Sequence, residues 1–153
     1  MGHSKKIMGN GRDFYLGVRK GSDSEYVAIS EAKTVNGVKG KVIAERKGKK
    51  DHTNLPKYSG TSDMYFRRNN NGIIQARLYI GNKKVLDFDW GHEHSNKEDN
   101  RKFPIGTVHV QLWVDKGNGD FARQSNDARY MNNEEMKKYG PLIKAFNPNV
   151  KFR

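Results

Sequence analysis

DMYFRRNNNGIIQARLYIGNKKVLDFDW, residues 63–90, indicates two consecutive β-hairpins. Three segments within it alternate apolar and polar side chains, as strands with one buried face do: 63–68, 73–80 and 85–90. Asn71-Gly72 and Gly81-Asn82 separate these segments and are typical of tight hairpin turns. Residues 107–114 alternate in the same way. We therefore expect a four-stranded antiparallel meander within residues 61–115.

The regions on either side of this meander complete a single predicted domain spanning residues 1–153. Residues 1–60 form a β-rich N-terminal part, with short expected strands at 14–18, 26–29 and 42–44. Residues 131–146 predict one long helix, capped by Asn132 or Asn133 and interrupted or kinked at Gly140-Pro141. Its apolar stripe consists of Met136, Tyr139, Leu142, Ile143 and Phe146. Packed on the apolar face of the sheet, this helix would give an α+β fold.

The composition indicates a polyanionic partner. The chain has 29 Lys and Arg against 17 Asp and Glu, a formal net charge of +12, and each basic side chain that meets a phosphate releases condensed counterions. It has no cysteine, which excludes disulfides and thiolate metal sites. No apolar run approaches the roughly 20 residues needed to span a bilayer. The N-terminus lacks the apolar segment of a signal peptide, so we expect any export to occur as part of a larger protein.

One face of the predicted meander has an unusual composition. Its side chains include arginines suited to phosphates, aromatic rings suited to bases, and acid/base groups: Tyr65, Arg67, Gln75, Arg77, Tyr79, Asp87, Asp89, His109, Gln111 and Trp113. A solvated sheet face is usually built from Lys, Glu, Thr and Ser. Two explanations stay open: a functional surface, which the residue types favour, or an ordinary face with cross-strand pairs such as Asp87 with Arg77.

Three of the five histidines lie close together in the sequence, at His92, His94 and His109. Histidine suits RNA cleavage because its pKa lies near neutrality: one group takes the 2′-OH proton and another protonates the leaving 5′-oxygen. A His-x-His pair with a third His or Asp could instead hold a divalent ion. We expect His3 at a terminal, tag-like position and His52 in a solvated basic loop.

Short motifs recur in order along residues 62–113: Tyr65-Phe66-Arg67, Asn71-Gly72, Arg77-Leu78-Tyr79, Asp87-Phe88-Asp89-Trp90-Gly91-His92 and His109-Val110-Gln111-Leu112-Trp113. In this order they resemble the C-terminal toxin domains of bacterial polymorphic toxins of the Rhs, cell-wall-associated and LXG types. The resemblance implies a nuclease, most often a ribonuclease that uses no metal. It further implies secretion as part of a larger toxin, action in the cytoplasm of a target cell, and a cognate immunity protein. Gln111 departs from the pattern, because a second histidine often stands there.

The sequence therefore predicts RNA cleavage by acid/base transesterification in a monomer, without a metal or other cofactor. The expected catalytic residues are His109, His92, His94, Asp89 and Arg77. The expected substrate-binding residues are Tyr65, Arg67, Tyr79, Gln111 and Trp113. Arginines would hold the scissile phosphate, aromatic rings would stack on bases, and Asp87 or Asp89 would orient a histidine.

Two other functions remain open at this point. The first is a metal-dependent nuclease acting on DNA, with Asp87 or Asp89 and His92 or His94 holding Mg²⁺ or Zn²⁺. The second is a non-catalytic nucleic-acid-binding module of a phage or mobile element, which would use the same face for stacking and phosphate contacts. Sensitivity to a chelator distinguishes the first from the metal-independent enzyme, and the absence of strand scission identifies the second.

Overall fold

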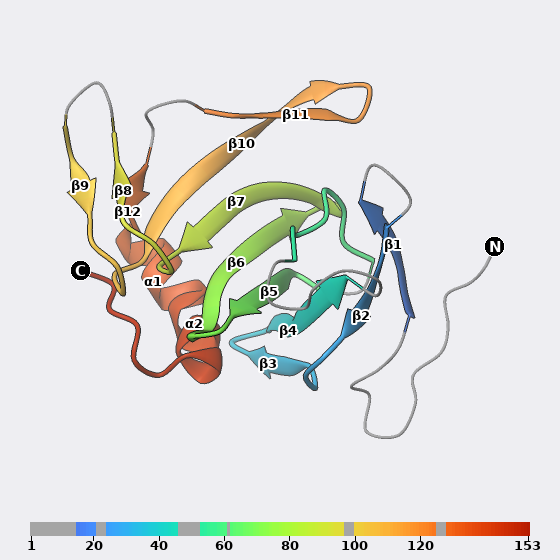
Figure 1. Cartoon of the computed structure of the whole chain (residues 1–153), viewed down its shortest axis with the longest axis horizontal. Helices are drawn as coiled ribbons and strands as arrows, with labels where there is room; N and C mark the ends of the chain where they lie inside the picture. The colour runs from blue at the N-terminus through green and yellow to red at the C-terminus, as the bar shows by residue number, and fades with distance from the viewer. Residues whose placement is uncertain (1–14, 21–23, 46–52, 61, 97–99, 125–127) are drawn as a thin grey trace.

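The computed structural model describes residues 15–20, 24–45, 53–60, 62–96, 100–124 and 128–153. Ten strands in this part of the chain form one sheet in the order β1-β2-β4-β5-β6-β7-β10-β11, with β3 beside β4 and β12 beside β10 (Figure 1). The strands β8 and β9 pair with each other. The strands are β1 (Tyr15–Lys20), β2 (Ser24–Ala28), β3 (Lys33–Val35), β4 (Val38–Glu45), β5 (Met64–Asn69), β6 (Gly72–Ile80), β7 (Lys83–Asp89), β8 (His94–Ser95), β9 (Lys102–Phe103), β10 (His109–Gly117), β11 (Asp120–Arg123) and β12 (Arg129–Tyr130).

The α+β class is confirmed, but the sheet is not a simple meander. As the alternation predicted, β5, β6, β7 and β10 are antiparallel neighbours. The expectation of a purely antiparallel arrangement is wrong at β4 and β5, which run parallel with Gly40 opposite Met64. Parallel neighbours need a crossover connection instead of a tight turn, and the connection here includes residues 53–60. The first residue of the strand expected at 14–18 lies outside the described residues.

The single long helix expected over 131–146 is two short helices, α1 (Asn133–Lys138) and α2 (Gly140–Phe146). The break falls at Gly140-Pro141, where proline occupies the first turn of α2 and needs no N–H donor. Asn132 caps α1, because its side chain accepts from the Glu135 N–H at 2.8 Å while the Glu135 carboxylate accepts from the Asn132 N–H at 3.0 Å. No helix in the described ranges is long and apolar enough to cross a membrane.

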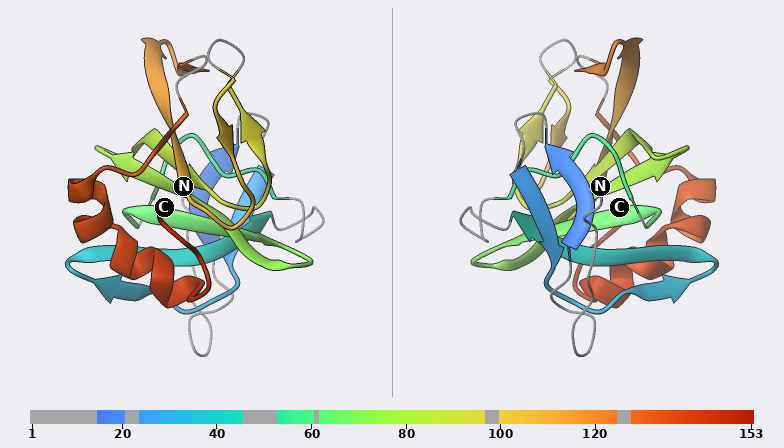
Figure 2. Two further views of the ribbon diagram at one scale, coloured as in Figure 1. Left: turned by 90° about the vertical axis from the view of Figure 1, so that its left-hand side faces the viewer. Right: turned by 90° about the vertical axis from the view of Figure 1, so that its right-hand side faces the viewer.

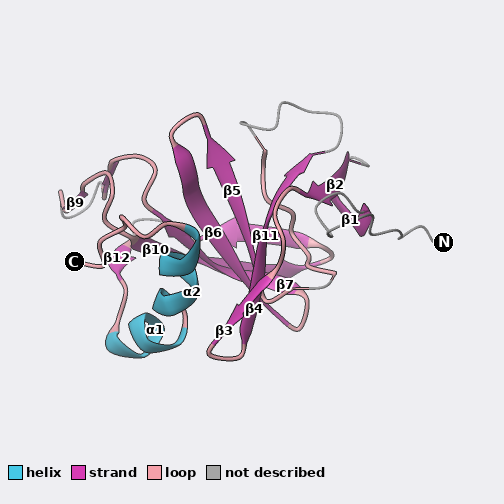
Figure 3. Ribbon diagram, turned by 90° about the horizontal axis from the view of Figure 1, so that it is seen from below, coloured by secondary structure: helices cyan, strands magenta, loops and turns pink. Residues whose placement is uncertain are grey.

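The main hydrophobic core lies between the sheet and the two helices, which cover the same face (Figures 2 and 3). Strand side chains of the alternating apolar set fill it, among them Phe66 and Phe88, which are fully buried. Phe66 meets Phe146 of α2 with ring centroids 4.3 Å apart, and Phe88 meets Tyr139 at 5.7 Å. The apolar stripe and the alternating strands therefore meet as the sequence predicted.

A second, smaller core lies on the opposite face of the sheet. It consists of Tyr26, Ala28, Ile43, Leu55, Tyr65 and Tyr79. Three side chains donate hydrogen bonds to the backbone of the segment that covers it: Tyr26 to the Asn54 carbonyl at 2.6 Å, Tyr79 to the Pro56 carbonyl at 2.7 Å, and Arg77 to the Leu55 carbonyl at 2.7 Å. The covering segment thus shields from solvent the part of the predicted polar face that lies on β5 and the centre of β6.

The turn after β7 requires glycine at position 91. A Cβ there would lie 2.5 Å from the Cβ of Ile74 on β6, much closer than real Cβ contacts allow. Replacing Gly91 with Ala should therefore push the turn off the sheet and lower the free energy of unfolding by roughly 1–3 kcal/mol. Urea denaturation measures this change, with Glu93→Ala in the same exposed turn as the control. Equal stability of the two variants would contradict the predicted close packing.

Candidate functional site

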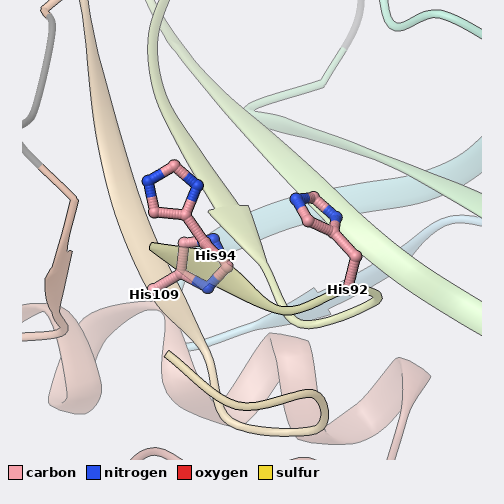
Figure 4. A group of neighbouring side chains, drawn as sticks. All are labelled: His92, His94 and His109. Carbon is pink, nitrogen blue, oxygen red and sulfur yellow. The ribbon is translucent and has the colours of Figure 1, made fainter. Parts of the chain in front are cut away.

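His92, His94 and His109 lie together where β7 ends and β10 begins (Figure 4). One ring nitrogen of each histidine can be chosen so that all three lie within 4.8 Å of one another. The His94 ring stacks on the His109 ring with centroids 5.2 Å apart and planes 24° apart. The His92 ring meets His109 edge-on at 5.9 Å. The structure therefore brings together the three histidines that the sequence identified.

Strand register explains how residues distant in sequence reach one place. Arg67 of β5 lies opposite Gln75 of β6, Gln75 opposite Asp89 of β7, and Asp89 opposite His109 of β10. These four residues form a line across the sheet, which we call the histidine row. Directly opposite residues in a sheet have neighbouring side chains on the same face. The histidine row therefore places the Arg67 guanidinium, the Asp89 carboxylate and the His109 imidazole on the same face of the sheet.

His109 forms the floor of the cluster. Its side chain is completely buried, and it packs against the Phe103 ring of β9 with centroids 5.3 Å apart. Neither ring nitrogen makes a well-formed hydrogen bond to any group that the structure describes. Burial, together with the nearby His94 and His92, lowers the pKa of His109 from its ordinary 6.5 to about 4, and a polar contact with the Thr107 backbone opposes this change. His109 is therefore neutral at physiological pH.

His92 is the accessible member of the cluster, with 55% of its side chain exposed. Its Nδ1 lies 3.3 Å from the Oδ1 of Asp89, which also accepts from the Gly91 N–H at 3.1 Å. Burial raises the pKa of Asp89, while His92, the Gly91 N–H and Arg67 oppose that shift. A carboxylate on Nδ1 fixes the ring orientation and directs Nε2 away from Asp89.

His94 is half-buried, and its partner is Asn96 instead of Asp89. Its Nε2 lies 3.2 Å from the Oδ1 of Asn96, whose amide donates to the Ala128 carbonyl at 3.1 Å. Asn96 is itself buried, so the acceptor that it presents is fixed. His94 therefore keeps Nδ1 available, as His92 keeps Nε2.

Arg67 adds a cation to the histidine row. It is half-buried, and its Nε donates to the Oε1 of Gln75. Burial lowers the pKa of Arg67 from its ordinary value, and the charges of Asp89 and Asp87 oppose this change. The remaining nitrogens of a guanidinium held in this way suit a phosphate oxygen.

A second row of paired residues runs parallel to the histidine row and consists of Tyr65, Arg77, Asp87 and Gln111. It has a structural role. Arg77 and Asp87 form a buried two-point ion pair, with Nε–Oδ1 at 2.6 Å and Nη2–Oδ2 at 3.1 Å. Arg123 of β11 also reaches Asp87, at 3.1 Å, and donates to the Oε1 of Gln111 at 2.9 Å. The charged groups of this row are hydrogen-bonded to one another, as buried charges require. Arg77, Asp87 and Gln111 therefore stabilise the sheet.

Trp113 lies beside this second row among three cations. The ring centroid is 3.2 Å from Nζ of Lys84, 4.8 Å from the Arg123 guanidinium carbon and 5.1 Å from that of Arg77. Burial, followed by the charge of Arg77, lowers the pKa of Lys84 to about 8. The half-buried indole therefore already has cations against it, which leaves less of its surface for a base.

The predicted site residues thus separate into two groups. Asp89, His92, His94, His109 and Arg67 gather at one end of the sheet. Tyr65 and Tyr79 lie in the second core with 0% and 4% exposure, and their rings have no open face for a base. His3 and His52 lie outside the described residues.

Sequence reasoning missed Asn96, Phe103 and Arg123, which complete the site and its support. Asn96 had a local signal, since it follows His94 by two residues in a strand-like segment. Phe103 and Arg123 had none, because their contacts depend on the β8–β9 and β10–β11 hairpins. No known family model matches the chain, and no match was found among curated proteins or solved structures.

The buried His109 makes stability depend on pH. Its pKa is about 4 in the folded protein and near 6.5 when unfolded, so between these values the unfolded chain binds more protons. Stability should therefore be complete above pH 6.5 and fall as the pH drops toward 4, by roughly 3 kcal/mol from this group. Urea unfolding in EDTA at several pH values would measure this, with His109→Gln as the comparison. An equal pH slope in both proteins would contradict the assignment.

Removing one charge of the buried pair should be severely destabilising. Arg77→Ala leaves Asp87 buried beside Arg123 alone and removes the donor to the Leu55 carbonyl, and we expect a loss of about 3–5 kcal/mol. Thermal unfolding followed by circular dichroism measures it. Asp115→Asn, which breaks the exposed Lys83–Asp115 pair, is the control and should leave the midpoint unchanged. Similar midpoints for the two variants would refute a central role for Arg77.

Proposed function

We propose that this domain is a ribonuclease that cleaves RNA by acid/base transesterification without a metal ion. One observation carries the proposal: an exposed His92 is held by the buried Asp89 next to the half-buried His94, on a chain of net charge +12. Two imidazoles, each held through one nitrogen, can perform the two proton transfers that RNA cleavage needs. The positive charge favours binding of the polyanionic substrate.

The side-chain contacts favour distinct roles for the two histidines. Nδ1 of His92 lies 3.3 Å from the Asp89 carboxylate, which leaves the Nε2 lone pair to remove the 2′-OH proton. The 2′-oxygen then attacks phosphorus, the bond to the 5′-oxygen breaks, and a 2′,3′-cyclic phosphate forms. Protonated His94 donates its Nδ1 proton to the departing 5′-oxygen, while the Oδ1 of Asn96 holds Nε2. Arg67 stabilises the negative charge of the phosphorane.

His109 has a different role in this proposal from the one that the sequence predicted. With no exposed surface it does not reach a substrate hydroxyl, so it acts as a positioning residue. Its ring supports His94 by stacking and limits the orientations that His94 can adopt. Arg77 and Gln111 support the site in the same indirect way, because their polar groups are engaged within the second row.

The resemblance to polymorphic-toxin domains supports a biological setting for this activity. In that setting the domain is secreted as part of a larger toxin, cuts RNA in the cytoplasm of a target cell, and is neutralised by a cognate immunity protein. Asp87, which the sequence offered as a metal ligand for a DNA-cutting alternative, already binds Arg77 and Arg123. These two contacts leave it poorly suited to a cation.

The test is incubation of the purified chain with total RNA and with plasmid DNA in excess EDTA. We expect RNA to be degraded and DNA to remain intact. His92→Ala should slow cleavage by about 10²-fold or more, because it removes the proposed base. Glu93→Gln changes an exposed neighbour in the same turn and should cut at the wild-type rate.

Two results would overturn the proposal. If RNA is lost only when a divalent ion is supplied, the enzyme is metal-dependent. If neither substrate is cut but RNA still binds with strong salt dependence, the domain is a non-catalytic binding module.

A further inference from the structure

The histidine cluster also has the features of a tridentate metal site. His109 comes from β10, whereas His94 of β8 and His92 of the turn before it come from one segment, so two distant parts of the chain supply the three rings. Their candidate nitrogens lie within 4.8 Å of one another (Figure 4). Nitrogens around a tetrahedral zinc ion are about 3.3 Å apart, given Zn–N bonds of roughly 2.0–2.1 Å. Binding of such an ion would therefore bring the three rings closer together.

His109 provides a second, independent indication of a ligand. Both of its ring nitrogens are buried and lack a well-formed hydrogen bond within the described part of the chain. An unsatisfied polar group in a protein interior is destabilising and calls for a specific explanation. One ring nitrogen of His109 lies within 4.8 Å of a ring nitrogen of each of the other two imidazoles, so the three histidines can share a cation.

The outer partners of the cluster resemble those of metal-binding histidines. Such ligands commonly hydrogen-bond through their second nitrogen to a carboxylate or carbonyl oxygen, which fixes the tautomer and the ring orientation. Asn96 holds Nε2 of His94 in this way at 3.2 Å, and the Asp89 carboxylate lies 3.3 Å from Nδ1 of His92 as an ion-pair partner. The nitrogens left available are Nε2 of His92 and Nδ1 of His94.

The ligand chemistry identifies the class of ion. Three imidazoles without a carboxylate or carbonyl ligand suit zinc and similar borderline ions, whereas magnesium and calcium prefer oxygen. The exposure of His92 leaves a side of the cluster open to solvent, so a water molecule or phosphate oxygen can take a fourth position. A site of three imidazoles and one open position is a familiar zinc arrangement.

We propose that His92, His94 and His109 bind a zinc-class divalent ion, and that this ion switches off RNA cleavage. The second half rests on the proposed function. The nitrogens that would bind the ion, Nε2 of His92 and Nδ1 of His94, are the nitrogens assigned to the two proton transfers. A lone pair bound to zinc cannot accept a proton, and a coordinated imidazole cannot donate one from the same atom. Ion binding and cleavage therefore exclude each other at this cluster.

Binding is measured first, without RNA, on the full chain after EDTA treatment and dialysis. Titration with Zn²⁺ by calorimetry should show one ion per chain. Titration with Co²⁺ should produce visible absorption bands of a four- or five-coordinate site. His92→Ala and His94→Ala should each weaken the affinity at least tenfold, whereas Glu93→Gln should leave it unchanged. Because His92 is exposed, the His92→Ala variant is expected to fold, and a loss of its zinc affinity can be attributed to the missing ligand.

Cleavage is then measured with and without one equivalent of Zn²⁺. Loss of at least nine-tenths of the activity, restored by EDTA, supports the switch. Absence of stoichiometric binding, or equal affinity in wild type and His92→Ala, overturns the metal site even if RNA is cut. Binding with cleavage that needs the ion overturns the switch. Absence of cleavage under every condition defeats the proposed function and the switch together, and the binding data still decide whether the site exists.

Discussion

The buried ion pair between Arg77 and Asp87 is the interaction on which the rest of the polar face depends. Two opposite charges within a sheet are stable there only if further hydrogen bonds satisfy them, and these bonds extend in two directions. Arg77 donates to the Leu55 carbonyl, which holds the covering segment over the second core. Asp87 accepts from Arg123 of β11, which ties the β10–β11 hairpin to the sheet. A single pair thereby fixes a loop on one side and a hairpin on the other.

This arrangement divides the polar face into parts with different roles. Around Arg77 and the two buried tyrosines, side chains that could have bound RNA instead close the sheet and satisfy one another. Two residues further along each strand lies the histidine row, beside which His92 is exposed and His94 is half-buried. The buried ion pair of Arg77 and Asp87 holds the neighbouring strands rigid, and this rigidity allows the histidines beside them to be positioned for catalysis. The net positive charge of the chain is thus only partly available to a polyanion, since some arginines are committed to the interior.

The alternation of side chains was enough to predict the strands β5, β6, β7 and β10 and their faces, and helical spacing predicted the apolar stripe of the helices. It was also enough to place Asp89 and His109 on one face, because both occupy positions of their strands opposite to the apolar set. It could not predict burial. Tyr65 and Tyr79 are covered by residues 53–60, and His109 by Phe103, through tertiary contacts that leave no periodic signal. The parallel pairing of β4 with β5 escaped prediction for the same reason, since a long connection has no characteristic turn.

That parallel pairing has a consequence for the order in which the molecule assembles. β3 and β4 meet across the short Asn36-Gly37 turn, and β5, β6 and β7 are joined by similar short turns, so each group can form from local contacts. The pairing of Gly40 with Met64 instead closes a long loop, and such contacts form slowly. Although the N-terminal strands are synthesised first, we expect their docking onto the central sheet to be the late step of folding. The second core, which spans this junction, then completes the native state.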